Sequence, residues 1–319
     1  MKPLFMWAGG KNKMLKKYQP YLPEKFDGYC EPFLGGGAMF IWAYEKNPEA
    51  RFVLNDLNKS VVQVYESIQN DLEDFLKRMD ELSAEYLPLP KGETDKPLEK
   101  QFGKDWAKLY KHKPCRRYFY FMLRQEHAYD YAKWSTAEEA ATLYFLMKTG
   151  FNGLWQENKN TNGRFGTPCG LMNQKEAVYD KENVLEWNKA LQNADLLCGD
   201  FKDTIDYVDS GYYVFLDPPY RGSFTQYGVD FDDLLQELVI DYLERARIAG
   251  AYVLLSNRDT GDGFFELRRG NNEMIYFDVT YTAGRRKVTH AKDIVSCWQD
   301  GFAAKKAREI LMIGEPHVI

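Results

Sequence analysis

The sequence predicts an α/β protein in which a large helical region interrupts the sheet. Strand and helix patterns alternate over residues 29–68, and apolar residues in the middle of the chain recur at helical rather than alternating spacing. Strand patterns return after residue 195. With 319 residues, of which 45% are hydrophobic and 28% charged, the chain is long enough for one large domain or for a core with an inserted domain.

The N-terminal part reads as a helix followed by a βαβ unit. The first helix ends before Pro23, and the glycine run 35–37 separates the first strand from the next helix. This order of elements is that of one half of a doubly wound fold. The expected elements are a helix over 13–21, a strand over 29–33, a helix over 38–46, a strand over 51–56 and a helix over 60–68.

The middle of the chain, from about Asp71 to Trp187, is expected to be mainly helical. It begins with proline-rich loops and continues with aromatic-rich helices over 118–131 and 138–148. The four adjacent aromatics at 118–121 are expected in the core rather than stacked on a ligand. Strands are expected again over 196–200, 212–216, 251–255, 273–279 and 308–313, with a helix over 234–249.

Composition excludes several classes of protein. Five scattered cysteines without C-x-x-C, and four histidines without ligand spacing, argue against a disulfide framework and a metal site. No segment has the length of a membrane span or the pattern of a signal peptide, so we expect a cytoplasmic protein without a membrane partner. The net charge of −5 argues against general coating of nucleic acid. Two basic patches, 111–117 and 285–292, suit a phosphate track or a solvated face equally well.

The strand over 212–216 ends in an unusual way, because Asp217, Pro218, Pro219 and Tyr220 follow it directly. Neither proline can continue a strand ladder, so the chain leaves the sheet at Asp217. Ligands of open α/β sheets bind outside the carboxyl ends of the strands. A carboxylate, one or two free main-chain carbonyls and a flat ring at that place suit a planar group bearing NH2. The alternative interpretation is an ordinary proline-rich turn.

A glycine turn and an acid follow the first two strands. Glu31 to Gly37 matches neither G-x-G-x-x-G nor the phosphate-binding G-x-x-x-x-G-K-[ST] pattern, so a pyrophosphate ligand is not implied. Asp56 ends the second strand, where an acid can accept hydrogen bonds from ribose hydroxyls. Tight packing of the glycines and helix capping by Asp56 are the alternatives. Together the two features suggest a nucleoside ligand without a phosphate chain.

Six segments, in chain order, resemble the motifs of the Dam-type (D12 class, alpha group) DNA adenine N6-methyltransferases, and the resemblance runs from Trp7 to about Ile313. The segments are Trp7-Ala8-Gly9-Gly10-Lys11, Glu31-Pro32-Phe33-Leu34-Gly35-Gly36-Gly37, Asn55-Asp56-Leu57-Asn58, Gly150-Phe151-Asn152-Gly153-Leu154, Asp217-Pro218-Pro219-Tyr220 and Leu255-Ser256-Asn257-Arg258-Asp259-Thr260.

The resemblance implies a Rossmann-like core with a mixed seven-stranded sheet and an inserted helical DNA-recognition domain. The expected parts are 1–70 with the donor-binding motifs, 71–187 as the recognition domain, and 188–319 with the D-P-P-Y motif. It further implies S-adenosylmethionine as methyl donor without a metal, double-stranded DNA as partner, and a monomer or weak dimer. Such enzymes serve restriction-modification systems, phages, or replication and repair, and the motifs do not choose among these roles.

The resemblance also assigns residues and a reaction, EC 2.1.1.72. The residues implied in donor binding are Trp7, Lys11, Glu31, Phe33, Gly35, Gly36, Asp56 and Asp217. The residues implied in catalysis are Asp217, Pro218, Pro219 and Tyr220. The exocyclic nitrogen of adenine is a poor nucleophile, and acceptors for its two N–H groups favour the geometry and charge of methyl transfer. The base must be flipped out of the duplex and stacked on the tyrosine. Cytosine N4 methylation and a non-catalytic DNA-binding module are the alternatives.

The polar segment 152–164 is the expected DNA-reading loop, because its side chains are of the kind that contact base edges and phosphates. The residues expected to bind DNA are Asn152, Gly153, Gln156, Asn158 and Arg164. GATC-methylating members of the family tend to carry a basic residue where this chain has Met6 and an arginine where it has Gln156. We therefore expect a target other than GATC, or relaxed discrimination. Residues 85–113 resemble an insertion to which the pattern assigns no role.

Overall fold

The structure is a computed structural model that describes residues 1–7, 10–153, 155–222, 231–281 and 305–317. Seven strands form one mixed sheet in the order β3-β2-β1-β4-β5-β7-β6, which is the order typical of methyl-transferring α/β folds and confirms the predicted fold class. The strands are β1 Gly28–Glu31, β2 Arg51–Asp56, β3 Ala194–Cys198, β4 Tyr212–Leu216, β5 Tyr252–Asp259, β6 Glu273–Tyr281 and β7 Lys305–Gly314.

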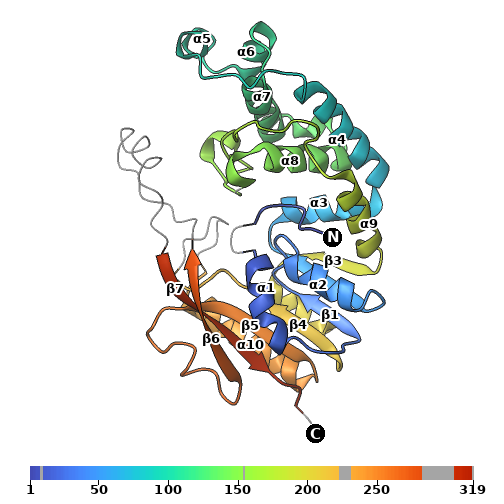
Figure 1. The fold of residues 1–319 in the computed structure, drawn as a ribbon, viewed down its shortest axis with the longest axis vertical. Coiled ribbons are helices and arrows are strands. Elements are labelled where there is room, and N and C mark those ends of the chain that lie inside the picture. The colour runs from blue at the N-terminus through green and yellow to red at the C-terminus, as the bar shows by residue number, and fades with distance from the viewer. Residues whose placement is uncertain (8–9, 154, 223–230, 282–304, 318–319) are drawn as a thin grey trace. The chain divides into compact units, whose positions relative to one another are not determined.

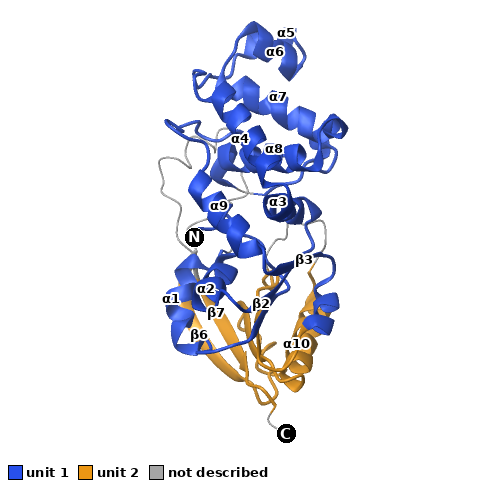
Figure 2. Ribbon diagram, turned by 90° about the vertical axis from the view of Figure 1, so that its right-hand side faces the viewer, with its two compact units in different colours: residues 1–207, 226–229 blue, residues 208–225, 230–319 orange. Residues whose placement is uncertain are grey.

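Strand direction follows the connections. The pairs β1–β2, β2–β3 and β4–β5 are parallel, whereas β7 runs antiparallel to both β5 and β6. Every predicted strand is confirmed, with ends that shift by a few residues. The chain divides into two compact units, Met1–Tyr207 with Gln226–Val229 (unit 1) and Val208–Thr225 with Asp230–Ile319 (unit 2; Figure 2). Each unit is described by itself below.

Unit 1 contains β1, β2 and β3 together with most of the helices (Figure 1). Its helices near these strands are α1 Asn12–Tyr18, α2 Ala38–Lys46, α3 Lys59–Asn70 and α9 Lys181–Leu191. The predicted helix over 13–21 ends as a short 3-10 turn, since Pro20 lacks the N–H that an α-helix needs. Aromatic rings fill the space between α2 and β2, where the Phe40 and Phe52 rings meet edge to face with centroids 5.2 Å apart.

The helical region of unit 1 follows α3 and consists of α4 Leu72–Tyr86, α5 Lys96–Gln101, α6 Trp106–His112, α7 Arg116–Tyr129 and α8 Thr136–Thr149. Helix α8 packs on both α3 and α4. All four aromatics at 118–121 are buried, which confirms the prediction that they belong to the core. Short 3-10 helices complete the described elements: η1 Gln19–Tyr21, η2 Tyr131–Lys133, η3 Phe151–Gly153, η4 Lys159–Thr161 and η5 Phe201–Tyr207.

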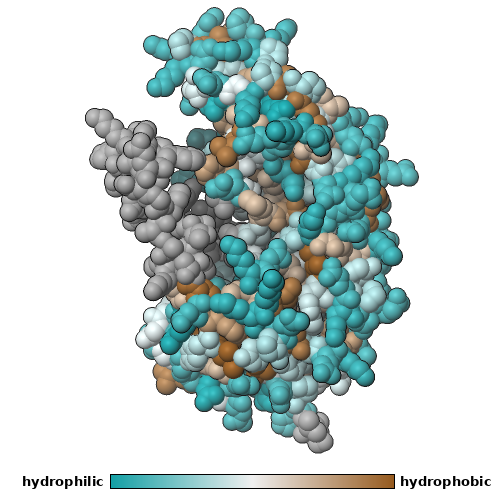
Figure 3. Space-filling view, viewed as in Figure 1, coloured by the Kyte–Doolittle hydropathy of each residue, from teal (hydrophilic) through white to brown (hydrophobic). Residues whose placement is uncertain are grey.

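The segment 85–113 forms α5 and α6, which pack on α7 through a small hydrophobic cluster of their own. The ring of Trp106 stacks on that of Phe121 at 4.6 Å, and Leu109 is fully buried. The backbone N–H of Arg116 donates to the carbonyl of Pro90 at 2.8 Å. The two ends of the segment that contains α5 and α6 therefore lie next to each other. On the face shown in Figure 3, the surface of this region is mostly hydrophilic.

The first basic patch, 111–117, is not a uniform charged face. Lys111 and Lys113 are exposed, but the Arg116 side chain is buried and donates to the backbone carbonyls of Met172 and Gln174 at 2.9 and 2.7 Å. Arg116 therefore ties the helical region together rather than facing solvent or phosphate. The second patch, 285–292, lies outside the described residues.

Unit 2 contains β4, β5, β6, β7 and the helix α10 Asp233–Ile248, which confirms the helix predicted over 234–249. All five residues of β4 are buried, as expected for a strand that is covered on both faces. Helix α10 packs on β5 through an apolar face. No helix in the described part of the chain is long and apolar enough to cross a membrane.

Candidate active site

In unit 1 the glycine turn, residues 34–37, is fastened to the end of β2. The backbone N–H of Gly35 donates to Oδ2 of Asp56 at 2.8 Å, and the N–H of Leu34 donates to the carbonyl of Asn55 at 2.8 Å. The other Asp56 oxygen accepts the N–H of Asn58 at 2.9 Å. The capping role considered for Asp56 belongs to Asn58, whose side chain accepts the N–H groups at the start of α3.

The glycines are needed because two indole rings lie against the turn. Gly35 and Gly37 have φ of +48° and +68°, which side chains rarely adopt. A Cβ on Gly35 would lie 2.7 Å from Nε1 of Trp7, and one on Gly37 would lie 2.5 Å from a ring carbon of Trp187. Packing against the indole rings is thus one reason for glycine at these two positions. The same contacts bring Trp7 to the turn.

Three other predicted residues, Lys11, Glu31 and Phe33, also belong to unit 1. Glu31 ends β1 with a side chain that is only 3% exposed and accepts the hydroxyl of Tyr29 at 2.8 Å. The Phe33 ring packs against that of Phe201 at 5.1 Å. Lys11 is buried where α1 begins. Ala8 and Gly9 of the first motif lie outside the described residues.

The predicted DNA-reading loop also belongs to unit 1 and folds back on itself. Short bridges join Gly150 to Cys169 and Glu157 to Phe165 in antiparallel fashion. Asn152 is exposed with φ of +53°, and Gln156 is partly exposed. Leu154 lies outside the described residues.

Asn158 and Arg164, two of the predicted DNA contacts, make contacts within the protein. The Arg164 guanidinium pairs with Glu139 and lies over the ring of Tyr131, 3.8 Å from its centre. Oδ1 of Asn158 accepts the N–H of Asn160 at 2.9 Å and so caps η4. Both side chains are thus positioned by contacts within the protein.

The first motif meets the loop, which the sequence did not predict. A Cβ on Gly153 would lie 2.8 Å from Cβ of Met6, and the rings of Trp7 and Trp155 approach to 6.4 Å. Met6 is 65% exposed. Since the sequence singled out Met6 and Gln156 as departures from the family pattern, both departures fall on one part of unit 1.

In unit 2 the acceptor motif, Asp217 to Tyr220, follows β4 directly. Leu216 pairs with Leu255 of β5, so the motif leaves the sheet beside Ser256. Asp217 is partly exposed and Pro218 is buried. Nε2 of Gln236 donates to the Pro219 carbonyl at 2.8 Å. The sequence predicted one or two free main-chain carbonyls here, and that of Pro219 has a partner inside the protein.

The tyrosine of this motif is anchored by its hydroxyl. The Tyr220 hydroxyl lies 2.9 Å from Oγ of Ser256 and donates to Oε2 of Glu309 at 3.2 Å. Ser256 is fully buried, and Glu309 is only 4% exposed. Two contacts from two different strands, β5 and β7, therefore fix the far end of the Tyr220 ring.

A buried pair of amides supports the contact to Pro219. Nδ2 of Asn257 donates to Oε1 of Gln236 at 2.9 Å, and Oδ1 of Asn257 accepts the backbone N–H groups of Arg221 and Arg258 at 3.1 and 2.7 Å. Both amide side chains are fully buried. We call Gln236 and Asn257 the amide relay.

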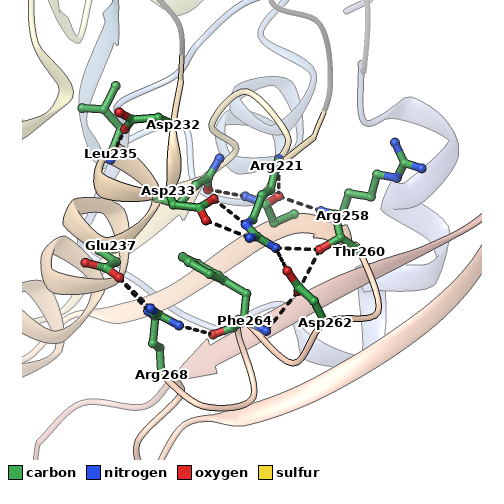
Figure 4. Close-up of polar contacts among 12 residues, drawn as sticks. Arg221, Asp232, Asp233, Leu235, Glu237, Arg258, Thr260, Asp262, Phe264 and Arg268 are labelled. Carbon is green, nitrogen blue, oxygen red and sulfur yellow. Dashed lines mark hydrogen bonds and ion pairs between the residues drawn. The ribbon is translucent and has the colours of Figure 1, made fainter.

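Arg221 secures the chain immediately after the motif (Figure 4). Its guanidinium forms a fork with Asp233 at 2.6 and 2.8 Å, donates to Oγ1 of Thr260 at 2.7 Å and pairs with Asp262. The guanidinium lies over the Phe264 ring, 4.2 Å from its centre. These hydrogen bonds, above all those to Asp233, raise the pKa of Arg221.

Sequence reasoning missed Gln236 and Glu309, and it named Asn257 only as part of a family-like segment. Gln236 lies on the buried face of α10 with Val239, Ile240 and Leu243, so a polar residue at an apolar position of that helix was the available signal. Glu309 is likewise a charge directly before the buried apolar run Ile310 to Ile313 of β7. Within the described ranges, no three His, Cys, Asp or Glu residues are grouped so that they could hold a metal ion.

Comparison with known proteins finds a family profile and several relatives that are described as DNA methyltransferases. A family profile described as D12 class N6 adenine-specific DNA methyltransferase matches residues 7–262. The type II methyltransferase M.MjaIII of Methanocaldococcus jannaschii is 30% identical over 283 residues, which cover 85% of this chain and 89% of that protein. The DNA adenine methylase of Haemophilus influenzae is 25% identical over 266 residues, covering 81% and 80%. The DNA N-6-adenine-methyltransferase of Escherichia phage P1 is 29% identical over 266 residues, covering 80% of this chain and 29% of that protein.

Proposed function

Because the chain belongs to the D12 class N6 adenine-specific DNA methyltransferase family, we propose that the glycine turn with Asp56 serves the methyl donor and that the acceptor motif serves the target adenine. The enzyme is an adenine-specific DNA methyltransferase, EC 2.1.1.72, and its family uses S-adenosylmethionine. This membership decides against cytosine N4 as target and against a non-catalytic module.

The residues at the ends of β1 and β2 fit this donor. S-adenosylmethionine is a nucleoside with a cationic sulfonium and no phosphate, and the two carboxylates of Glu31 and Asp56 suit a cation and ribose hydroxyls but would repel a pyrophosphate. When bound, it supplies an electrophilic methyl group. We assign the ribose to Asp56, and we assign the rest of the donor site to Trp7, Lys11, Glu31, Phe33, Gly35, Gly36 and Asp217.

The acceptor motif suits the exocyclic amine of adenine. The Asp217 carboxylate and the Pro218 carbonyl accept its two N–H bonds, which directs the nitrogen lone pair toward the incoming methyl group and stabilises the positive charge that develops there. The Tyr220 ring stacks on the flipped base. The observation that carries this assignment is the motif at the end of a buried strand, with the Pro219 carbonyl and the Tyr220 hydroxyl held by buried partners.

The Asp217→Ala variant tests this role. We expect at least about a 1,000-fold loss of methyl transfer, because one of the two acceptors that stabilise the transition state is removed. Tritiated methyl transfer to DNA from cells without adenine methylation measures the loss, and circular dichroism checks the fold. Near-normal transfer by this variant would end the proposed mechanism.

We further propose that the target differs from GATC or is read with relaxed discrimination, with Asn152 and Gln156 facing the DNA. Glutamine pairs naturally with adenine and arginine with guanine. Single-molecule sequencing of DNA methylated by the purified protein reports the base type and the flanking sequence together. Protection of GATC sites alone, complete against nucleases that distinguish their methylation, would contradict the proposal.

A further inference from the structure

We propose that the amide relay, Gln236 and Asn257, positions the acceptor motif for methyl transfer by fixing the direction of the Pro218 carbonyl. The inference rests on the proposed function of the acceptor motif. It assigns a catalytic consequence to two side chains that touch neither the donor nor the base, and the relay therefore acts only through the backbone of residues 217–221.

The relay has one consistent hydrogen-bond direction. Gln236 donates to a carbonyl, the Pro219 oxygen, and therefore presents its own oxygen to Nδ2 of Asn257. Asn257 in turn presents its oxygen to two backbone N–H groups, which can only donate. Turning either amide over would place like atoms against each other at every contact. Because both side chains are fully buried, a broken contact has no water to replace it.

The restricted backbone of Pro219 links the hydrogen bond at its own carbonyl to the direction of the Pro218 carbonyl. The ring of Pro219 locks its φ near about −65°, and the peptide bond between the two prolines is planar. Once Gln236 holds the Pro219 carbonyl, ψ of Pro219 is fixed as well, and the Pro218 carbonyl has little remaining freedom. The relay thus orients the backbone acceptor of the amine from within the protein.

The tyrosine end of the acceptor motif is held by contacts that do not involve Gln236. The Tyr220 hydroxyl contacts Ser256 and Glu309, and the backbone N–H of Arg221 ends on the same Asn257 oxygen as the relay. Loss of Gln236 alone therefore leaves the tyrosine anchored, and the expected defect is a displaced carbonyl rather than an unfolded loop. Displacement of a reacting group by about 1 Å is enough to cost roughly 100-fold in rate.

Two variants of Gln236 separate positioning from simple stability. Gln236→Met keeps the shape but donates nothing to Pro219, and we expect single-turnover methylation to fall about 10- to 100-fold with the dissociation constant of S-adenosylmethionine unchanged within about twofold. Asn272→Leu is the matched control, because Asn272 is a buried amide of the same unit that donates to the Arg269 carbonyl at 2.8 Å, away from the motif. It should lower the melting temperature without lowering the rate.

Gln236→Glu gives a readout that a merely structural role would not move. An ionised carboxylate cannot donate to the Pro219 carbonyl, whereas a protonated one can donate there and still accept from Asn257. Burial raises the pKa of such a carboxyl, so the competent form is present below that pKa and is lost as pH rises through it. The rate of the variant relative to the unaltered enzyme should therefore increase as pH is lowered from about 8.5 to about 6, by up to about tenfold per pH unit.

Failure of the relay proposal and failure of the proposed function would give different results. A relative rate of Gln236→Glu that does not change with pH, together with a Gln236→Met rate no lower than that of Asn272→Leu, overturns the proposal while the unaltered enzyme still methylates adenine. Absence of adenine methylation by the unaltered enzyme would instead refute the proposed function. Should Gln236→Met fail to fold, the isosteric Gln236→Glu decides the question by its pH profile alone.

Discussion

The Asp56 carboxylate accepts backbone N–H groups of Gly35 and Asn58, yet burial outweighs these bonds and raises its pKa above the ordinary value. A folded-state pKa above the unfolded one means that the folded protein binds the proton more tightly. The resulting stability is present below the unfolded pKa and is lost as pH rises through the folded pKa. The ionised Asp56 at neutral pH is thus a cost to folding, which suits a group that serves a ligand.

Donor binding should therefore depend on the protonation of Asp56. Ribose hydroxyls donate to the carboxylate, so we expect the affinity for S-adenosylmethionine in calorimetry to weaken as pH falls toward the Asp56 pKa. Asp56→Asn should bind roughly 10-fold more weakly at neutral pH and lose this pH dependence, since a charged acceptor is replaced by a neutral one. Asp80→Asn, which removes a carboxylate held by Lys181 and Tyr179 instead, is the matched control and should keep the profile of the unaltered enzyme. An affinity of the unaltered enzyme that is constant with pH would contradict the ribose role.

The residues of the acceptor motif could be predicted because their chemical role follows from their neighbours in the sequence. Asp217 follows a buried strand and two prolines follow Asp217, so the neighbouring sequence indicates what the carboxylate can do. Gln236 and Glu309 have no such neighbours. Their partners, Pro219 and Tyr220, are 17 and 89 residues away in the chain, and only the folded sheet brings them together.

Among the elements, α5 and α6 depend on tertiary contacts. They have six and seven residues, which is too short for a helix to be stable in water on its own. Their stability comes from the cluster around Leu109 and from the stacking of Trp106 on Phe121.

Trp106→Ala should therefore loosen α5 and α6 without affecting the rest of unit 1. We expect about 2 kcal/mol less protection against local unfolding, because a large apolar surface and an aromatic pair are lost. Hydrogen exchange should become faster over 96–112 and stay unchanged over α8 and β2. Tyr110→Phe, which removes only an exposed hydroxyl contact to Glu85, is the control. Faster exchange spread evenly over unit 1 would show that the two helices are not a separate cooperative element.

Helices and strands with a clear period were predictable, and those without one were not. The segment 38–46 was placed to the residue, because a glycine run precedes it and Pro48 follows it. The helices α5 and α6 lie among prolines, glycines and lysines with little periodicity, and their order comes from packing on α7. Helix α4 has an amphipathic pattern, with Phe75, Met79 and Leu82 on its buried face, that could have been found from the sequence.

For the molecule as a whole, the assigned residues divide between the two compact units. The glycine turn, Trp7 and Asp56 belong to unit 1, and the acceptor motif with its amide relay and Glu309 belongs to unit 2. A ligand that binds only the folded chain stabilises it in proportion to its occupancy. Thermal stabilisation by the donor alone, in the absence of DNA, should therefore depend on the first group and not on the relay.

Donor at about 100 times its dissociation constant should add about 2.7 kcal/mol of stability, which for a chain of this length raises the melting temperature by about 4 °C. Asp56→Ala should lose most of this shift, because the carboxylate that we assign to the ribose is gone. Gln236→Met and Glu309→Leu should lower the starting melting temperature, since each removes a partner from a buried polar group, but should keep the shift itself. Differential scanning fluorimetry with and without S-adenosylmethionine measures all four proteins side by side. If the shift disappears in Gln236→Met as well, the relay contributes to donor binding, and its role is not confined to the acceptor motif.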